Sequence, residues 1–146
     1  MRSSLSAVLI ATIAIAACGD KPKPAAETAA PAVTPSGPIT PCATCKLIEI
    51  GMVTTDKGNY FEPKNIEAHL GDVLRYKLVV GVHNVTFPPD SNPGKSGLPA
   101  VTPLLQLPGQ TTDILLNFGT GTFRFQCDAH AALGMTGSVK VEEKKG

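Results

Sequence analysis

Features typical of a nucleic-acid-binding or membrane-spanning protein are missing from this 146-residue chain. Lys and Arg number 13 against 12 Asp and Glu, and from Cys42 onward each sign numbers ten, so the sequence shows no basic footprint for nucleic acid. The longest apolar run, Leu5–Ala17, is too short to cross a bilayer as a helix. These absences argue against a nucleic-acid partner and against a spanning segment.

Helical patterns are scarce, and the chain has no internal repeat. Short runs rich in Val, Ile, Thr and Phe recur instead, separated by Gly and Pro. Apolar and polar residues alternate in several of these runs, as in Leu74–Val80 and Phe123–Cys127, which is the pattern of half-buried strands. We therefore expect one all-β domain, a Greek-key β-sandwich covering residues 42–146.

The first 41 residues predict export and membrane attachment. Residues 1–17 combine Arg2 with the apolar run, which is typical of a secretory signal. The stretch Ile15-Ala16-Ala17-Cys18-Gly19 resembles the bacterial lipobox, which implies lipidation of Cys18 in a cell envelope, facing the periplasm or the exterior. An ordinary signal peptide with a stray cysteine is the alternative. Residues 18–41, rich in Ala, Pro, Thr and Ser, predict a disordered linker between lipid and domain.

A second pair of cysteines stands at the start of the predicted domain. Cys42 and Cys45 follow a proline and precede a strand pattern, which does not suit a thioredoxin-like motif. Haem attachment is disfavoured because Lys46 stands where a histidine is required. We expect a local disulfide, since nearby thiols join in an oxidising compartment, with a second metal site or a thiol-exchange role as alternatives.

The segment from Phe123 to Met135 carries the chemistry. Phe123 and Phe125 alternate with polar residues, so a period of two directs Cys127 inward with them. His130 and Met135 follow in one short loop, whose closure costs little entropy. A thiol, an imidazole and a thioether form the mixture of ligands that copper prefers, but one imidazole is still needed.

His83 is the expected fourth ligand. It shares a strand face with Val85 and Phe87, so the ligand would arrive from a distant strand. Two histidines and a cysteine with a weak axial methionine are typical of electron-transfer copper, whereas zinc prefers a closed tetrahedron without thioether. The hypothesis is one-electron shuttling with Cys127 as thiolate, His83 and His130 as equatorial nitrogens, and Met135 as axial ligand.

The ligand order resembles that of the cupredoxins, the small blue copper proteins. The spacing Cys-x2-His-x4-Met is that of the plastocyanin and pseudoazurin branch, and the resemblance covers about residues 47 to 142. Further marks are Gly71-Asp72-Val73 and His83-Asn84-Val85. The resemblance implies one type 1 copper per chain in an electron carrier that is not an enzyme. The chain departs from the plastocyanin pattern at Ala129, where that family has proline.

The resemblance also assigns roles around the copper. It implies that Asn84 ties the two ligand loops together by hydrogen bonds and helps to hold the thiolate. It places His130 near the surface inside an apolar patch, here Ala131–Gly134 joined by Pro88 and Pro89, where a redox donor and acceptor would dock. We expect a monomer that meets these partners at a membrane.

Other functions remain open at this point. A copper carrier or storage module would use the same ligands without electron transfer. A nitrite-reductase reading would need a second copper site and a second domain, for which the chain is too short. A binuclear centre would need another cysteine beside Cys127. The long loop at residues 88–109 is either a lid or a docking surface, and a short helix over Thr102–Leu107 is possible.

Overall fold

A computed structural model of the chain describes residues 38–145. The predicted signal peptide, Cys18 and most of the predicted linker lie outside the described residues. Within the described part, no helix has the length and apolar character needed to cross a membrane. The elements, in chain order, are β1 (Leu47–Thr55), β2 (Gly58–Glu62), β3 (Asn65–His69), β4 (Val73–Leu78), η1 (Pro89–Ser91), β5 (Thr111–Leu115), β6 (Gly121–Gln126), η2 (Ala131–Leu133) and β7 (Thr136–Glu142).

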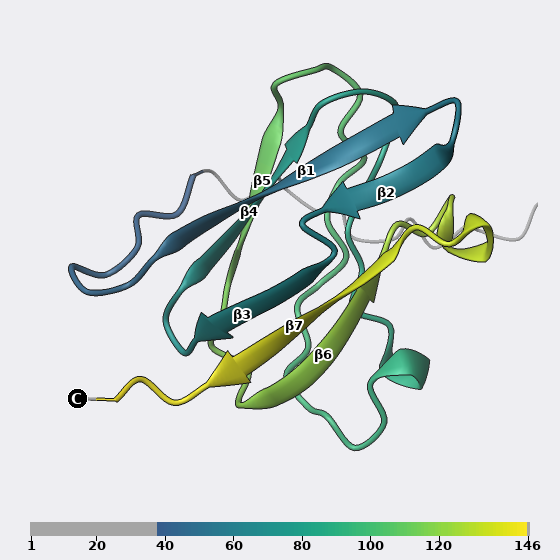
Figure 1. Ribbon diagram of the computed structural model, residues 1–146. Coiled ribbons are helices and arrows are strands. Elements are labelled where there is room, and N and C mark those ends of the chain that lie inside the picture. The colour runs from purple at the N-terminus through teal and green to yellow at the C-terminus, as the bar shows by residue number, and fades with distance from the viewer. Residues whose placement is uncertain (1–37, 146) are drawn as a thin grey trace, which may run out of the picture. The chain divides into compact units, whose positions relative to one another are not determined.

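The strands form two sheets, with the orders β2-β1-β4-β5 and β3-β7-β6 (Figure 1). β1 pairs in parallel with β4 and β3 pairs in parallel with β7, whereas the remaining neighbours are antiparallel. The chain changes sheet between β2 and β3, returns between β3 and β4, and changes again between β5 and β6. The prediction of an all-β, two-sheet sandwich is confirmed.

The alternation of residues decides which side chains enter the core. In β6 and the residue after it, Phe123, Phe125 and Cys127 are buried, while the intervening Arg124 stays exposed. Phe125 lies edge-on to Phe61 and to Tyr76, with ring centroids 5.0 and 5.4 Å away, so aromatic contacts link the two sheets. Met52 is also fully buried, as a core residue.

The segment that carries His83 is not a regular strand. β4 ends at Leu78, and Val80, which the alternation placed on the inner face, is 48% exposed. His83 and Thr86 form isolated bridges, His83 to Leu105 and Thr86 to Gln126. Thr86 and Gln126 exchange two backbone hydrogen bonds of 2.9 Å, which brings this segment beside the end of β6 and hence beside Cys127.

The loop over residues 88–109 divides into inward and outward parts. Leu105 is buried and exchanges backbone hydrogen bonds of 2.8 and 3.1 Å with His83, so this part of the loop covers the ligand. Leu104 and Leu107 point to solvent, 52% and 64% exposed. The short helix considered for Thr102–Leu107 is absent, because the backbone N–H and carbonyl of Leu105 form hydrogen bonds with His83. The only helical turn in this described loop is η1.

The start of the domain reverses direction before β1. Cys42 and Cys45 are joined by a disulfide, and the Cys45 N–H donates to the Cys42 carbonyl at 2.9 Å. Upstream of this turn, the Ile39 N–H donates to a carboxylate oxygen of Asp113 at 2.7 Å. Arg75 donates two further hydrogen bonds to the same carboxylate, at 2.8 and 2.7 Å.

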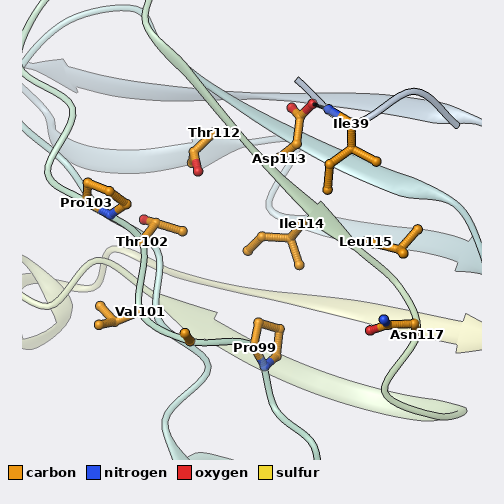
Figure 2. Close-up of a pocket in the computed structure, with 11 residues that line it drawn as sticks. Ile39, Pro99, Val101, Thr102, Pro103, Thr112, Asp113, Ile114, Leu115 and Asn117 are labelled. Carbon is orange, nitrogen blue, oxygen red and sulfur yellow. Dashed lines mark hydrogen bonds between the residues drawn. The ribbon is translucent and has the colours of Figure 1, made fainter. Parts of the chain in front are cut away.

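A cavity of about 220 Å³ lies beside this contact (Figure 2). It is lined by Ile39, by residues 99–103 of the long loop, and by residues of β5 and Asn117 just beyond it. Asp113 also lines it, and its carboxylate accepts hydrogen bonds from Arg75 and Ile39. None of the predicted copper ligands lines this cavity, so it is separate from the metal site.

Candidate metal centre

Three of the four predicted ligands meet at one point. The two Nδ1 atoms of His83 and His130 are 3.2 Å apart, and the Cys127 Sγ lies 3.7 Å from the first and 3.4 Å from the second. His83 comes from the segment after β4, whereas Cys127 and His130 come from the β6–β7 connection. The expectation that a distant histidine closes the site is therefore confirmed.

The triangle of ligand atoms fits a single metal ion. With zinc bond lengths of about 2.0 Å to imidazole nitrogen and about 2.3 Å to thiolate sulfur as a guide, angles of roughly 105–120° separate ligand atoms by about 3.2–3.7 Å. The three observed separations lie in that range. His83 and Cys127 are fully buried and His130 is partly exposed, so a bound ion would be shielded from water.

Met135 is held beside the other loop ligands by its backbone. Its N–H donates to the His130 carbonyl at 3.1 Å, and its carbonyl accepts from the Cys127 N–H at 3.1 Å. The side chain is fully buried. η2 ends at Gly134, whose φ of 90° is the left-handed conformation that glycine adopts without strain. A thioether in this position suits copper and adds little for zinc.

The other ring nitrogen of His83 faces hydrogen-bond acceptors. Its Nε2 lies 3.2 Å from the Val80 carbonyl and 3.0 Å from the Thr54 hydroxyl. Burial, reinforced by the neighbouring His130, lowers the pKa of His83, although the Val80 carbonyl opposes this. A lowered pKa keeps the ring neutral near pH 7, which is the form that binds a metal.

Asn84 links the two ligand-bearing segments. Its side-chain oxygen accepts from the Asp128 N–H at 2.9 Å, and its amide nitrogen donates to the Asp128 carboxylate at 2.8 Å. Thr86 donates to the same carboxylate at 2.7 Å. Burial alone would raise the pKa of Asp128, but the hydrogen bonds from Thr86, Asn84 and Gln126 lower it overall. Because Asp128 follows Cys127 directly, these bonds hold the thiol in place.

Sequence reasoning missed three residues around the site. Thr54, Asp128 and Leu105 each contact a ligand or the residue beside one. None of the three carried a local signal in the sequence, because each contact joins segments that are far apart along the chain. The Pro88 carbonyl accepts a hydrogen bond from the Asn92 side chain, which also donates to the Arg124 carbonyl in β6.

The fold and the ligand set together define a mononuclear copper protein built on a two-sheet β-sandwich. Residues 49–142 match the family model of copper-binding proteins, the plastocyanin/azurin family. Plastocyanin from Vicia faba is 35% identical over 101 residues, which cover 64% of this chain and 99% of that protein. Plastocyanin from Prochlorothrix hollandica is 35% identical over 104 residues, covering 68% and 76%.

A solved structure agrees on the fold. The oxidized form of plastocyanin from Dryopteris crassirhizoma aligns with a TM-score of 0.53 at 24% identity, covering 64% of this chain and 99% of that one. The chain belongs to the plastocyanin/azurin family of copper-binding proteins. It is a blue copper electron-transfer protein, not an enzyme, and His83, Cys127, His130 and Met135 form its type 1 site.

Proposed function

We propose that this chain passes single electrons between two redox proteins of a bacterial cell envelope, while lipid on Cys18 holds it at a membrane. The observation that carries the electron-transfer role is the preassembled triangle of His83, His130 and Cys127. Copper held there exchanges one electron between Cu(I) and Cu(II). Because His83, Cys127 and Met135 are buried and the ligand segments are tied by hydrogen bonds, the site favours a fixed geometry over one that opens to release its metal.

The proposed docking surface is the exposed side of the ligand loop around His130. His130 is partly exposed, and Leu133, three residues later in η2, is 71% exposed. Leu104 adds an exposed apolar side chain next to Leu105, which pairs with His83. A small apolar surface of this kind favours brief contacts with donor and acceptor. We propose that the carrier works as a monomer.

The proposed membrane attachment is compatible with an accessible copper site. The disulfide and the junction with the linker stand at the Leu47 end of β1. Thr54, whose hydroxyl contacts His83, stands at the other end of this nine-residue strand. A linker that joins the domain at the Leu47 end of β1 leaves the docking surface around His130 accessible to soluble redox partners.

The metal assignment is tested with the purified full-length chain. Added Cu(II) should produce an intense visible absorption band and the electron spin resonance signal of a copper thiolate, and Cys127→Ser should lose both. A colourless wild-type protein would refute the assignment. A chelator challenge separates shuttle from carrier, because a shuttle keeps its copper through repeated oxidation and reduction, whereas a carrier gives it up.

The docking surface is tested through electron exchange between two copies of the protein, which needs no identified partner. Leu133→Lys should slow self-exchange at least tenfold, measured from NMR line broadening in mixtures of the oxidised and reduced protein, and leave the visible band unchanged. Lys140→Leu, on β7, serves as the control. For attachment, Cys18→Ala should move the protein from the membrane fraction to the soluble fraction; if both forms fractionate alike, the lipid proposal is wrong.

A further inference from the structure

We propose that Thr54, supported by Asn59, is a positioning residue that fixes the tautomer and ring plane of His83. Thr54 and Asn59 are paired residues of the β1–β2 hairpin. The Thr54 hydroxyl donates to the Asn59 side-chain oxygen at 2.6 Å and lies 3.0 Å from the His83 Nε2. The proposal takes the metal site as described and assigns a role to two residues outside it.

The directions of these hydrogen bonds determine where the His83 proton sits. A hydroxyl has one proton, and Thr54 gives it to Asn59, so its oxygen can only accept from the imidazole. The Val80 carbonyl, 3.2 Å from the same nitrogen, is also only an acceptor. A neutral His83 therefore carries its proton on Nε2 and presents an unprotonated Nδ1 toward Cys127 and His130.

The backbone around Val80 enforces this contact. The Val80 carbonyl accepts from the Thr54 N–H at 3.1 Å as well as from the His83 ring, so the hairpin and the ligand segment are joined at one point. Gly81 lies directly against the contact with a φ of 103°. A Cβ at Gly81 would overlap the Thr54 hydroxyl and come within 2.7 Å of the His83 Nε2, so only glycine leaves room.

The hydroxyl matters because His83 is fully buried. Because the ring is shielded from solvent, its N–H depends on the Thr54 hydroxyl and the Val80 carbonyl as acceptors, and these two groups hold the ring in one orientation. Removing such an outer partner of a metal-binding histidine typically costs about 10–100-fold in metal affinity. Since Val80 remains, we expect the loss from Thr54 alone to be near the lower end, about tenfold.

The test compares Thr54→Val with Thr54→Ser in the full-length protein. Valine keeps the branched shape and removes the hydroxyl, whereas serine keeps the hydroxyl. Thr54→Val should weaken copper binding about tenfold in competition with a chelator, and it should shift the reduction potential; Thr54→Ser should stay close to wild type. Thr55→Val is the matched control, because Thr55 is the next residue of β1 and its hydroxyl touches only the turn at residues 57–58.

A second readout does not depend on copper. In the metal-free wild-type protein, nitrogen NMR should show His83 as the Nε2-protonated tautomer with a slowly exchanging proton, and Thr54→Val should accelerate that exchange. Asn59→Asp keeps an acceptor for Thr54 and should preserve the tautomer. If His83 is protonated on Nδ1, or Thr54→Val matches Thr55→Val in affinity, potential and exchange, the proposal is wrong. If the wild-type protein with added Cu(II) lacks the visible absorption band, the metal assignment is refuted instead. The NMR result on the metal-free protein then decides the proposal about Thr54.

Discussion

At the scale of single residues, the geometry of the metal ligands is fixed by hydrogen bonds to residues that are not themselves ligands. The polar groups around the ligands are paired: Asn84 and Thr86 bind Asp128, and the Val80 carbonyl and the Thr54 hydroxyl face the His83 ring. Buried polar groups without partners cost free energy, so this pairing also holds the cage in one geometry. The site therefore depends on polar residues that a list of copper ligands omits.

Away from the site, Asp113 makes stability depend on pH. Burial favours its neutral form, but the hydrogen bonds from Arg75 and Ile39 and the charge of Arg75 lower the pKa overall. A carboxylate with a lowered pKa stabilises the fold above its unfolded pKa of about 3.9, and this contribution is lost as the pH falls through the folded pKa. Asp113→Asn should lower the free energy of unfolding by about 2 kcal/mol at pH 7.

The difference in free energy of unfolding between the wild-type protein and Asp113→Asn should shrink as the pH falls below the pKa of the unfolded carboxyl. Urea unfolding of these two proteins at pH 7 and near pH 3 measures this difference. Glu49→Gln is a control, because Glu49 is exposed and its contact with Lys77 is a 3.5 Å surface pair. An equal gap at both pH values would show that Asp113 does not act through its charge.

For a single element, β1 links the two ends of the sandwich. It runs from the Cys42–Cys45 disulfide to Thr54 beside His83. Strands of this length span roughly 30 Å at about 3.3 Å per residue. Events at the disulfide end should therefore leave the ligand geometry untouched.

The double substitution Cys42→Ser and Cys45→Ser tests this separation. The disulfide closes a loop of only four residues, so its loss should lower stability by at most about 2 kcal/mol. The visible band of the copper protein should not move. Thermal unfolding and absorption spectra of the two proteins provide the measurements, and a shifted band would show that the two ends of β1 are coupled.

β7 passes closely over the aromatic core at Gly137. A Cβ there would overlap the Phe125 ring and come within 2.7 Å of the Lys64 carbonyl, which also accepts from the Ser138 N–H at 3.0 Å. Gly137→Ala should therefore cost about 1–3 kcal/mol through overpacking. Denaturant unfolding measures it. Ser138→Ala, one residue along on the solvent side, should cost less than half as much; equal losses would contradict the role of close packing.

On the scale of the whole molecule, the metal site joins segments that are far apart in sequence. His83 and Cys127 are 44 residues apart, and only the folded sandwich brings them together. Copper that binds the folded state alone stabilises it by mass action, by about 4 kcal/mol at a thousandfold excess over the dissociation constant. Copper should therefore raise the melting temperature of the wild-type protein in calorimetry.

Cys127→Ser should remove most of that increase. Serine is close in size to cysteine, so the metal-free forms should melt at similar temperatures and the comparison isolates the thiolate. An equal shift in both proteins would mean that copper binds elsewhere, for instance at surface groups.

Alternation of apolar and polar residues along the chain predicted most of the strands and the burial of Phe123, Phe125 and Cys127, because these depend on the period of a strand, but it wrongly predicted a strand around His83. Tertiary structure alone decided that Thr54 meets His83, that Leu105 pairs with it instead of forming a helix, and that Val80 faces solvent. Those contacts arise from the pairing of distant segments, and no local pattern encodes that register.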